Sequence, residues 1–259
     1  MKTVILAGGK GTRISEEGGL RPKPLVEIGG FPILWHIMKY YSHFGHSEFI
    51  ICAGHNGYLI KEYFAQYYLH ASDITFDFSK NNEVTIHNNI AEPWRVTIVD
   101  TGQEAQTGCR VKRVEKYVGN EPFFLTYGDG LSNIALDKLA EQHIRSDNVV
   151  TISIVKPAGR FGVIEIDADK NKALLFREKS TMDSAWINAG FMVVSRSIFD
   201  YLPDKEDCIL ERAPFQKICV EKRLGTYRHD GFWQCMDTPR DRLFLEKLWI
   251  DKKAFWKTW

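Results

Sequence analysis

A glycine-rich loop near the N-terminus has the residue types that bind phosphate. The apolar run of residues 3–6 leads into Gly8-Gly9-Lys10-Gly11-Thr12-Arg13, and Lys23 follows between two prolines. Glycines let backbone N–H groups approach a phosphate closely. Thr12 adds a hydroxyl donor, and the planar guanidinium of Arg13 suits phosphate oxygens. The loop therefore predicts a phosphorylated ligand, against the simpler interpretation of a tight turn after a strand.

Two common phosphate-binding loops do not fit this spacing. The P-loop requires a glycine, four residues and then Gly-Lys-Ser/Thr, and the chain has no such spacing. The dinucleotide fingerprint requires a third glycine at the position of Ile14. The phosphorylated ligand is therefore expected in a different type of loop.

Two aspartates are candidate metal ligands. Asp129 lies in Tyr127-Gly128-Asp129-Gly130, at the end of an apolar run. Ligands of open parallel sheets bind beyond the carboxyl ends of strands, and a carboxylate there suits Mg²⁺. Asp237 lies among bulky apolar residues just before Thr238 and Pro239. A helix cap at Asp237 or Thr238 is the alternative, and it does not exclude metal binding.

Alternating strands and helices must position these residues. Strands are predicted at residues 3–6, 49–52, 123–127 and 149–155, and helices from Pro32 to about Gly45 and at 59–67, 136–144 and 237–250. This order favours an α/β fold with a mostly parallel sheet and helices on both faces. Residues 73–100 and 159–176 are predicted to be β-rich excursions from the main sheet.

The composition excludes several classes of protein. A net charge of +1 over 259 residues gives no overall attraction to nucleic acid or to an anionic membrane. The five cysteines contain no CxxC pair, which argues against a disulfide framework or a zinc site and favours a reducing compartment. The apolar start is too short for a signal peptide or a membrane span. We expect a cytoplasmic protein that binds neither nucleic acid nor membrane.

Taken together, the motifs resemble those of the sugar-1-phosphate nucleotidyltransferases. The shared segments include LAGGxGTR, PKPL, YGDG and GFWQxMDTxRD, and the resemblance runs from Lys2 to Trp259. Residues 32–41, 92–102, 107–110 and 231–238 resemble the cytidylyl branch of the family. The resemblance implies a Rossmann-like three-layer α/β/α fold in one domain, 1–259. Within it we expect a nucleotide-binding part at roughly 1–130, a sugar-phosphate part at roughly 131–240 and a helix with a tryptophan-rich tail at 238–259.

The same resemblance implies substrates, cofactor and roles. It implies CTP and a sugar 1-phosphate, α-D-glucose 1-phosphate, as substrates, together with Mg²⁺ and a homo-oligomer. It assigns nucleotide binding to Leu6, Ala7, Gly8, Gly9, Lys10, Gly11, Thr12, Arg13, Lys23, Thr107, Arg110 and Gly128. It assigns the sugar phosphate to Glu178, Lys179, Asn188 and Gly190, and Mg²⁺ to Asp129 and Asp237. Catalysis by direct displacement is expected from Arg13, Lys23, Asp129 and Asp237.

Some positions depart from the family pattern. The departures are Ala105, Cys109, Ser180, Ala189 and Cys235. They cluster around the acceptor and the wall of the nucleotide pocket, so UTP, dTTP or another phosphorylated acceptor is an alternative within the same chemistry. A non-catalytic sugar-nucleotide sensor and an interaction module built on the aromatic tail are the other two alternatives.

Overall fold

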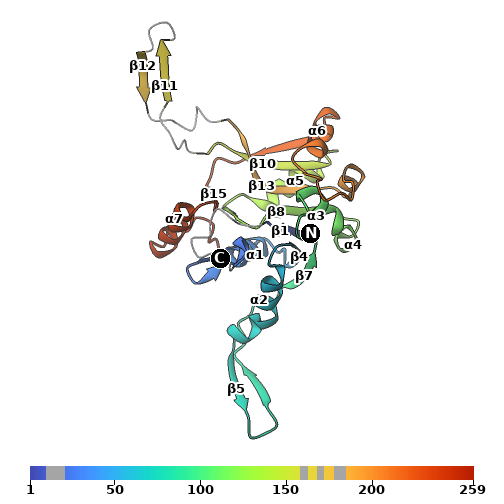
Figure 1. Ribbon diagram of the computed structural model, residues 1–259, viewed down its shortest axis with the longest axis vertical. Helices are drawn as coiled ribbons and strands as arrows, with labels where there is room; N and C mark the ends of the chain where they lie inside the picture. The colour runs from blue at the N-terminus through green and yellow to red at the C-terminus, as the bar shows by residue number, and fades with distance from the viewer. Residues whose placement is uncertain (10–20, 158–162, 168–171, 178–184) are drawn as a thin grey trace.

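The computed structural model describes residues 1–9, 21–157 and 185–259, and gives the backbone pairing of residues 163–167 and 172–177. Its centre is a seven-stranded sheet in the order β14-β10-β13-β8-β1-β4-β7 (Figure 1). The strands are β1 (Thr3–Leu6), β4 (Glu48–Ala53), β7 (Arg95–Asp100), β8 (Phe123–Tyr127), β10 (Val150–Val155), β13 (Ile187–Val194) and β14 (Leu224–Arg228). Neighbours pair in parallel except at β13, which is antiparallel to both β8 and β10.

Both faces of this sheet are buried. Successive side chains of a strand point to opposite faces, so in β1 Ile5 belongs to one apolar cluster while Val4 and Leu6 belong to the other. All four residues of β1 are buried, which is typical of a strand inside a parallel sheet covered on both sides. The predicted mostly parallel sheet is confirmed.

Helices form the outer two layers. The cluster containing Ile5 is covered by α1 (Ile33–His43), α2 (Gly57–His70), α5 (Leu136–Ile144) and α7 (Pro239–Ile250). The opposite cluster is covered by α3 (Thr107–Arg113), α4 (Glu115–Val118), α6 (Ala213–Val220) and the 3-10 helix η3 (Arg196–Tyr201). The expected three-layer arrangement is confirmed. Within the described part of the chain, no helix combines the length and the apolarity needed to span a membrane.

In the part of the chain that the structure describes, four two-stranded sheets accompany the main one. They are β2 (Glu27–Ile28) with β3 (Phe31–Pro32), β5 (Asp73–Asp77) with β6 (Glu83–His87), β9 (Gly130–Ser132) with β15 (Trp233–Cys235), and β11 (Val163–Asp167) with β12 (Lys172–Arg177). The β5–β6 hairpin projects from the body of the molecule (Figure 1).

Three sequence expectations need correction. Residues 73–100 are only in part an excursion, because β7 pairs in parallel with β4 at the edge of the main sheet. The first long helix begins at Ile33, since Pro32 pairs with Glu27 and serves as its N-cap. The strand β13 was not predicted: it contains Gly190, which lacks the branched side chain that favours extended backbone.

The aromatic tail belongs to the core. Trp256 is fully buried in the same cluster as α1. Its indole Nε1 donates to Nδ1 of His36 at 3.3 Å. Nδ1 is therefore the accepting nitrogen, and Nε2 carries the proton that is donated to the Ile28 carbonyl at 2.8 Å. The fully buried His36 is thus a neutral imidazole that fastens the tail to α1.

Burial of neutral histidines predicts a loss of stability in mild acid. Burial lowers the pKa of His36 and of His143 from 6.5 to about 4. Between about pH 6.5 and 4, these histidines therefore bind protons in the unfolded chain but stay neutral in the folded protein. The stabilisation is complete above about pH 6.5 and is lost as the pH falls toward 4. Each such histidine contributes a slope of up to about 1.4 kcal/mol per pH unit in this window.

Urea unfolding between pH 6.5 and 4.5 measures this slope. We expect His143→Gln to make this slope shallower by the equivalent of nearly one proton, because glutamine does not titrate. Glutamine can still hydrogen bond to Thr151 and Ser195, the partners of His143, so the fold should be kept. His87→Gln, at an exposed position on β6, is the matched control. Equal slopes for the two variants would contradict the prediction.

Candidate active site

Two cavities open where β1 and β8 end. The first has a volume of about 410 Å³ and the second about 320 Å³. Tyr127 and Asp129 line both. Asp129 follows β8, so it lies at the carboxyl edge of the sheet, where ligands of such folds bind. The two cavities therefore adjoin at one carboxylate.

The predicted residues divide between these cavities. The first is lined by Leu6, Ala7, Gly8, Gly9, Lys23, Thr107, Arg110 and Gly128, all expected at the nucleotide. The second is lined by Asn188 and Gly190, expected at the sugar phosphate, and by Asp237. The remaining predicted residues, Lys10, Gly11, Thr12, Arg13, Glu178 and Lys179, lie outside the described residues.

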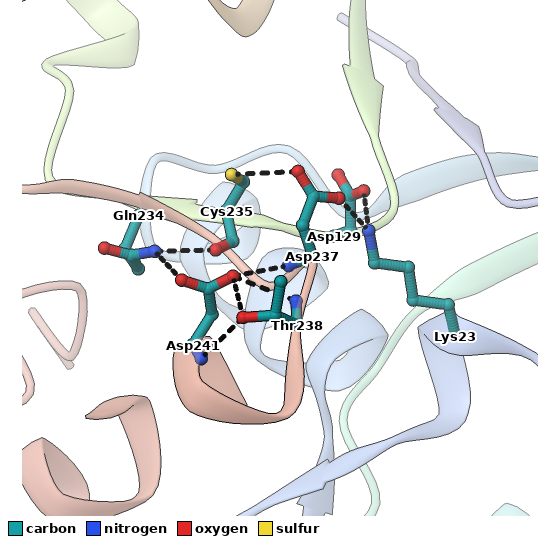
Figure 2. Close-up of polar contacts among 7 residues, drawn as sticks. All are labelled: Lys23, Asp129, Gln234, Cys235, Asp237, Thr238 and Asp241. Carbon is teal, nitrogen blue, oxygen red and sulfur yellow. Dashed lines mark hydrogen bonds and ion pairs between the residues drawn. The ribbon is translucent and has the colours of Figure 1, made fainter. Parts of the chain in front are cut away.

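Lys23 joins the two aspartates. Its Nζ lies 2.5 Å from Asp129 Oδ2 and 2.6 Å from Asp237 Oδ1 (Figure 2). Burial opposes the charge of the ammonium group, but the two carboxylates outweigh burial and hold the pKa of Lys23 above its usual value. Pro22 and Pro24 flank the lysine in the short helix η1 (Lys23–Leu25) and restrict its backbone. A fixed positive charge thus lies between two carboxylates.

Strand pairing explains how the two aspartates meet. In the β9–β15 sheet Cys235 pairs with Gly130. The next amide, that of Met236, donates to the Asp129 carbonyl at 2.8 Å. Asp237 is the next residue, so its carboxylate lies near that of Asp129, and both contact the ammonium group of Lys23. The two residues that the sequence singled out separately are therefore neighbours.

Thr238, and not Asp237, caps the last helix. Thr238 Oγ1 accepts from the Asp241 amide at 3.3 Å, and Asp241 Oδ2 accepts from the Thr238 amide at 2.9 Å (Figure 2). This reciprocal pair is a capping box. Of the two cap candidates, only Thr238 has this role, and the Asp237 carboxylate is directed to Lys23 instead.

Arg110 holds together the ends of three parallel strands. Its buried guanidinium donates to the carbonyls of Gly8, after β1, and Ala53, at the end of β4, and to Thr101, after β7. It also donates to the carbonyls of Gly102 and Gln103. A Cβ atom on Gly8 would lie 2.2 Å from Arg110 Nη1, so glycine is needed here to admit the arginine. Arg110 lines the first cavity, but its Nη1 and Nη2 groups already donate to the protein, so its contact with the nucleotide remains a prediction.

Asn188 and Gly190 position an aromatic ring. Asn188 Nδ2 donates to the Tyr127 hydroxyl at 3.3 Å, and its Oδ1 accepts from the Gly190 amide at 2.8 Å. Gly190 has φ +83°, and a Cβ atom there would lie 2.5 Å from Tyr127 Cδ2. Tyr127 therefore forms part of the wall between the cavities. The motif Tyr127-Gly128-Asp129-Gly130 predicts roles for Gly128 and Asp129 but none for Tyr127.

The cluster offers a metal ion two carboxylates. Among the described residues, no group of three or more His, Cys, Asp or Glu side chains is arranged to hold a metal. The pair still fits Mg²⁺, which proteins often bind through one or two carboxylates while phosphate oxygens and water complete the shell. The position of the Lys23 ammonium shows that the two carboxylates stabilise a cation between them.

Comparison with known proteins identifies the family of the chain. The sequence profile of the nucleotidyl transferase family matches residues 2–234. The chain is 48% identical over 260 residues to "Glucose-1-phosphate cytidylyltransferase" of Salmonella typhi, covering 100% of both chains. It is 40% identical over 259 residues to "Probable glucose-1-phosphate cytidylyltransferase" of Bacillus subtilis, again covering 100% of both. Among solved structures, apo UDP-glucose pyrophosphorylase shares the fold, with a TM-score of 0.69 at 18% identity, over 97% of this chain and 98% of that one. The chain therefore belongs to the nucleotidyl transferase family, among the relatives of glucose-1-phosphate cytidylyltransferase.

Proposed function

We propose that this protein transfers a cytidylyl group from CTP to a sugar 1-phosphate, α-D-glucose 1-phosphate, forming CDP-glucose and pyrophosphate. One observation carries the proposal: two cavities adjoin at Asp129, where Lys23 and Asp237 complete a charged cluster. A nucleoside triphosphate in the first cavity and a sugar phosphate in the second would bring their phosphates together at this cluster. The curated relatives carry the name of this reaction.

The reaction requires no general base from the protein. A phosphate oxygen of the sugar 1-phosphate is already an anion near neutral pH and attacks the α-phosphorus of CTP. The new P–O bond forms as the bond to the β-phosphate breaks, and pyrophosphate leaves with the bonding electrons. Because two polyanions must meet, catalysis consists of positioning and charge neutralisation. We assign Lys23 to the α-phosphate and, by the resemblance, Arg13 to the leaving pyrophosphate and Lys179 to the acceptor phosphate.

Asp129 and Asp237 are the proposed ligands of Mg²⁺. Bound there, the ion would neutralise charge on the reacting phosphates. Lys23 now lies in the position between the two carboxylates, so it would have to leave them when a divalent ion enters. The phosphates of the nucleotide offer the ammonium group a new anionic partner. The expected homo-oligomer and cytoplasmic location remain predictions.

The nucleotide preference is the first test. Cytosine N3 accepts a hydrogen bond where uracil N3 carries a proton. A cavity wall whose hydrogen-bonding groups match cytosine therefore leaves some of these groups unpaired when uracil binds. Each buried unpaired group costs about 1–3 kcal/mol, so we expect CTP to exceed UTP at least about tenfold in kcat/KM. Pyrophosphate release from CTP, UTP and dTTP with a panel of sugar 1-phosphates measures this. Equal values for CTP and UTP contradict the cytidylyl assignment, and no release with any pair contradicts the reaction class.

The aspartates are the second test. Asp129→Asn and Asp237→Asn should each lower kcat at least about a hundredfold, the scale at which lost electrostatic stabilisation usually appears. Asparagine keeps the shape and removes the charge. Because both residues are proposed to hold one ion, the double variant should lose little more than either single variant. Initial rates at saturating Mg²⁺ measure all three.

Asp251→Asn is the matched control for these variants, since Asp251 is an exposed aspartate at the end of α7. It should keep wild-type turnover. Melting temperatures must be recorded alongside, to separate lost chemistry from lost folding. Near-wild-type turnover in either single variant, or losses that multiply in the double variant, would exclude a shared catalytic ion.

A further inference from the structure

A chain of side-chain hydrogen bonds runs behind both cavities. Thr107 Oγ1 donates to Glu211 Oε2 at 2.6 Å. The Tyr127 hydroxyl donates to the other oxygen, Glu211 Oε1. Asn188 Nδ2 donates in turn to the Tyr127 hydroxyl at 3.3 Å. One carboxylate therefore connects a residue of the first cavity wall with residues of the second.

Glu211 lines neither cavity. It lies between η3 and α6, in a segment that is bonded to the start of α3 along its backbone. The Gln106 amide donates to the Glu206 carbonyl at 2.8 Å, and the Gly108 amide donates to the Cys208 carbonyl at 2.9 Å. The segment that carries Glu211 is thus held in place by backbone contacts that do not depend on a substrate.

The carboxylate sets the direction of every hydrogen bond in the chain. An ionised carboxylate only accepts, so both hydroxyls must point their protons at it. The Tyr127 hydroxyl accordingly donates its proton to Glu211 Oε1. The tyrosine oxygen is then left to accept from Asn188 Nδ2. This fixes the asparagine amide with Oδ1 toward the Gly190 amide.

We propose that Glu211 is a positioning residue for the acceptor cavity, and this inference rests on the proposed function of the two cavities. It orients the Tyr127 ring and the Asn188 amide from behind. The two ends of this series of hydrogen bonds, at Thr107 and at Asn188, are supported differently. Thr107 Oγ1 also accepts from the Leu210 amide at 2.9 Å, so the nucleotide side has a second support. Binding of the sugar phosphate therefore depends on Glu211 more than binding of the nucleotide does.

Glu211→Gln tests this difference. Glutamine keeps the size of the side chain but can no longer accept from both hydroxyls. We expect the KM for the preferred sugar 1-phosphate to rise about tenfold, the scale of one lost hydrogen bond to a charged group, while the KM for CTP changes less than about threefold. Tyr127→Phe should show the same pattern, and the two substitutions together should not add, because they break one chain. Glu206→Gln, at an exposed carboxylate of the same segment, is the matched control.

Two measurements keep the outcomes distinct. Wild-type turnover comes first: if another nucleotide or sugar phosphate is preferred, the proposed function is corrected and the variants are compared with that pair. Calorimetric titration of the sugar phosphate into the wild type and Glu211→Gln reports acceptor binding without turnover, and it should show the same loss. A lower melting temperature with both KM values unchanged would make Glu211 merely structural. Equal rises in both KM values would also overturn the proposal.

Discussion

The ammonium group of Lys23 is the cation on which the geometry of the site depends. Asp129 follows a central strand and Asp237 precedes the last helix, so only the fold brings their carboxylates together. Two adjacent carboxylates repel each other unless a cation lies between them. Lys23 supplies that cation at 2.5 and 2.6 Å, from a backbone held by two prolines. The protein is therefore already organised around a positive charge where we propose Mg²⁺.

Buried polar contacts fix the walls around this centre. Arg110 joins the carboxyl ends of β1, β4 and β7 through their carbonyls and Thr101, and Glu211 joins Thr107 to Tyr127. Both side chains act through other residues of the walls. Electrostatic catalysis depends on groups that are oriented before the substrates arrive. The parallel sheet gives the site its location, and these contacts give it a defined shape.

Much of this could be predicted from sequence because the signals are local. A buried strand followed by glycines, or by an aspartate between glycines, is visible in a few residues, and both features lie at the cavities. The partners of these residues could not be predicted, since they depend on tertiary placement. Spacing does not show what a buried arginine faces, and Arg110 contacts carbonyls. Glu211 lies in an irregular segment without a motif. The strand β7 was placed outside the main sheet because a hairpin, not a helix, precedes it.

The most direct test of this account is metal binding to the free protein. Mn²⁺ can be titrated by calorimetry into the wild type, Lys23→Met and, as a control, Lys39→Met, whose ion pair with Glu92 lies elsewhere. Lys23→Met removes the ammonium group that lies against both carboxylates, so we predict at least about tenfold tighter Mn²⁺ binding, the change that roughly 1.4 kcal/mol produces. Asp237→Asn added to Lys23→Met should abolish this gain. Equal Mn²⁺ affinity in the wild type and Lys23→Met would contradict the claim that Lys23 occupies the metal position.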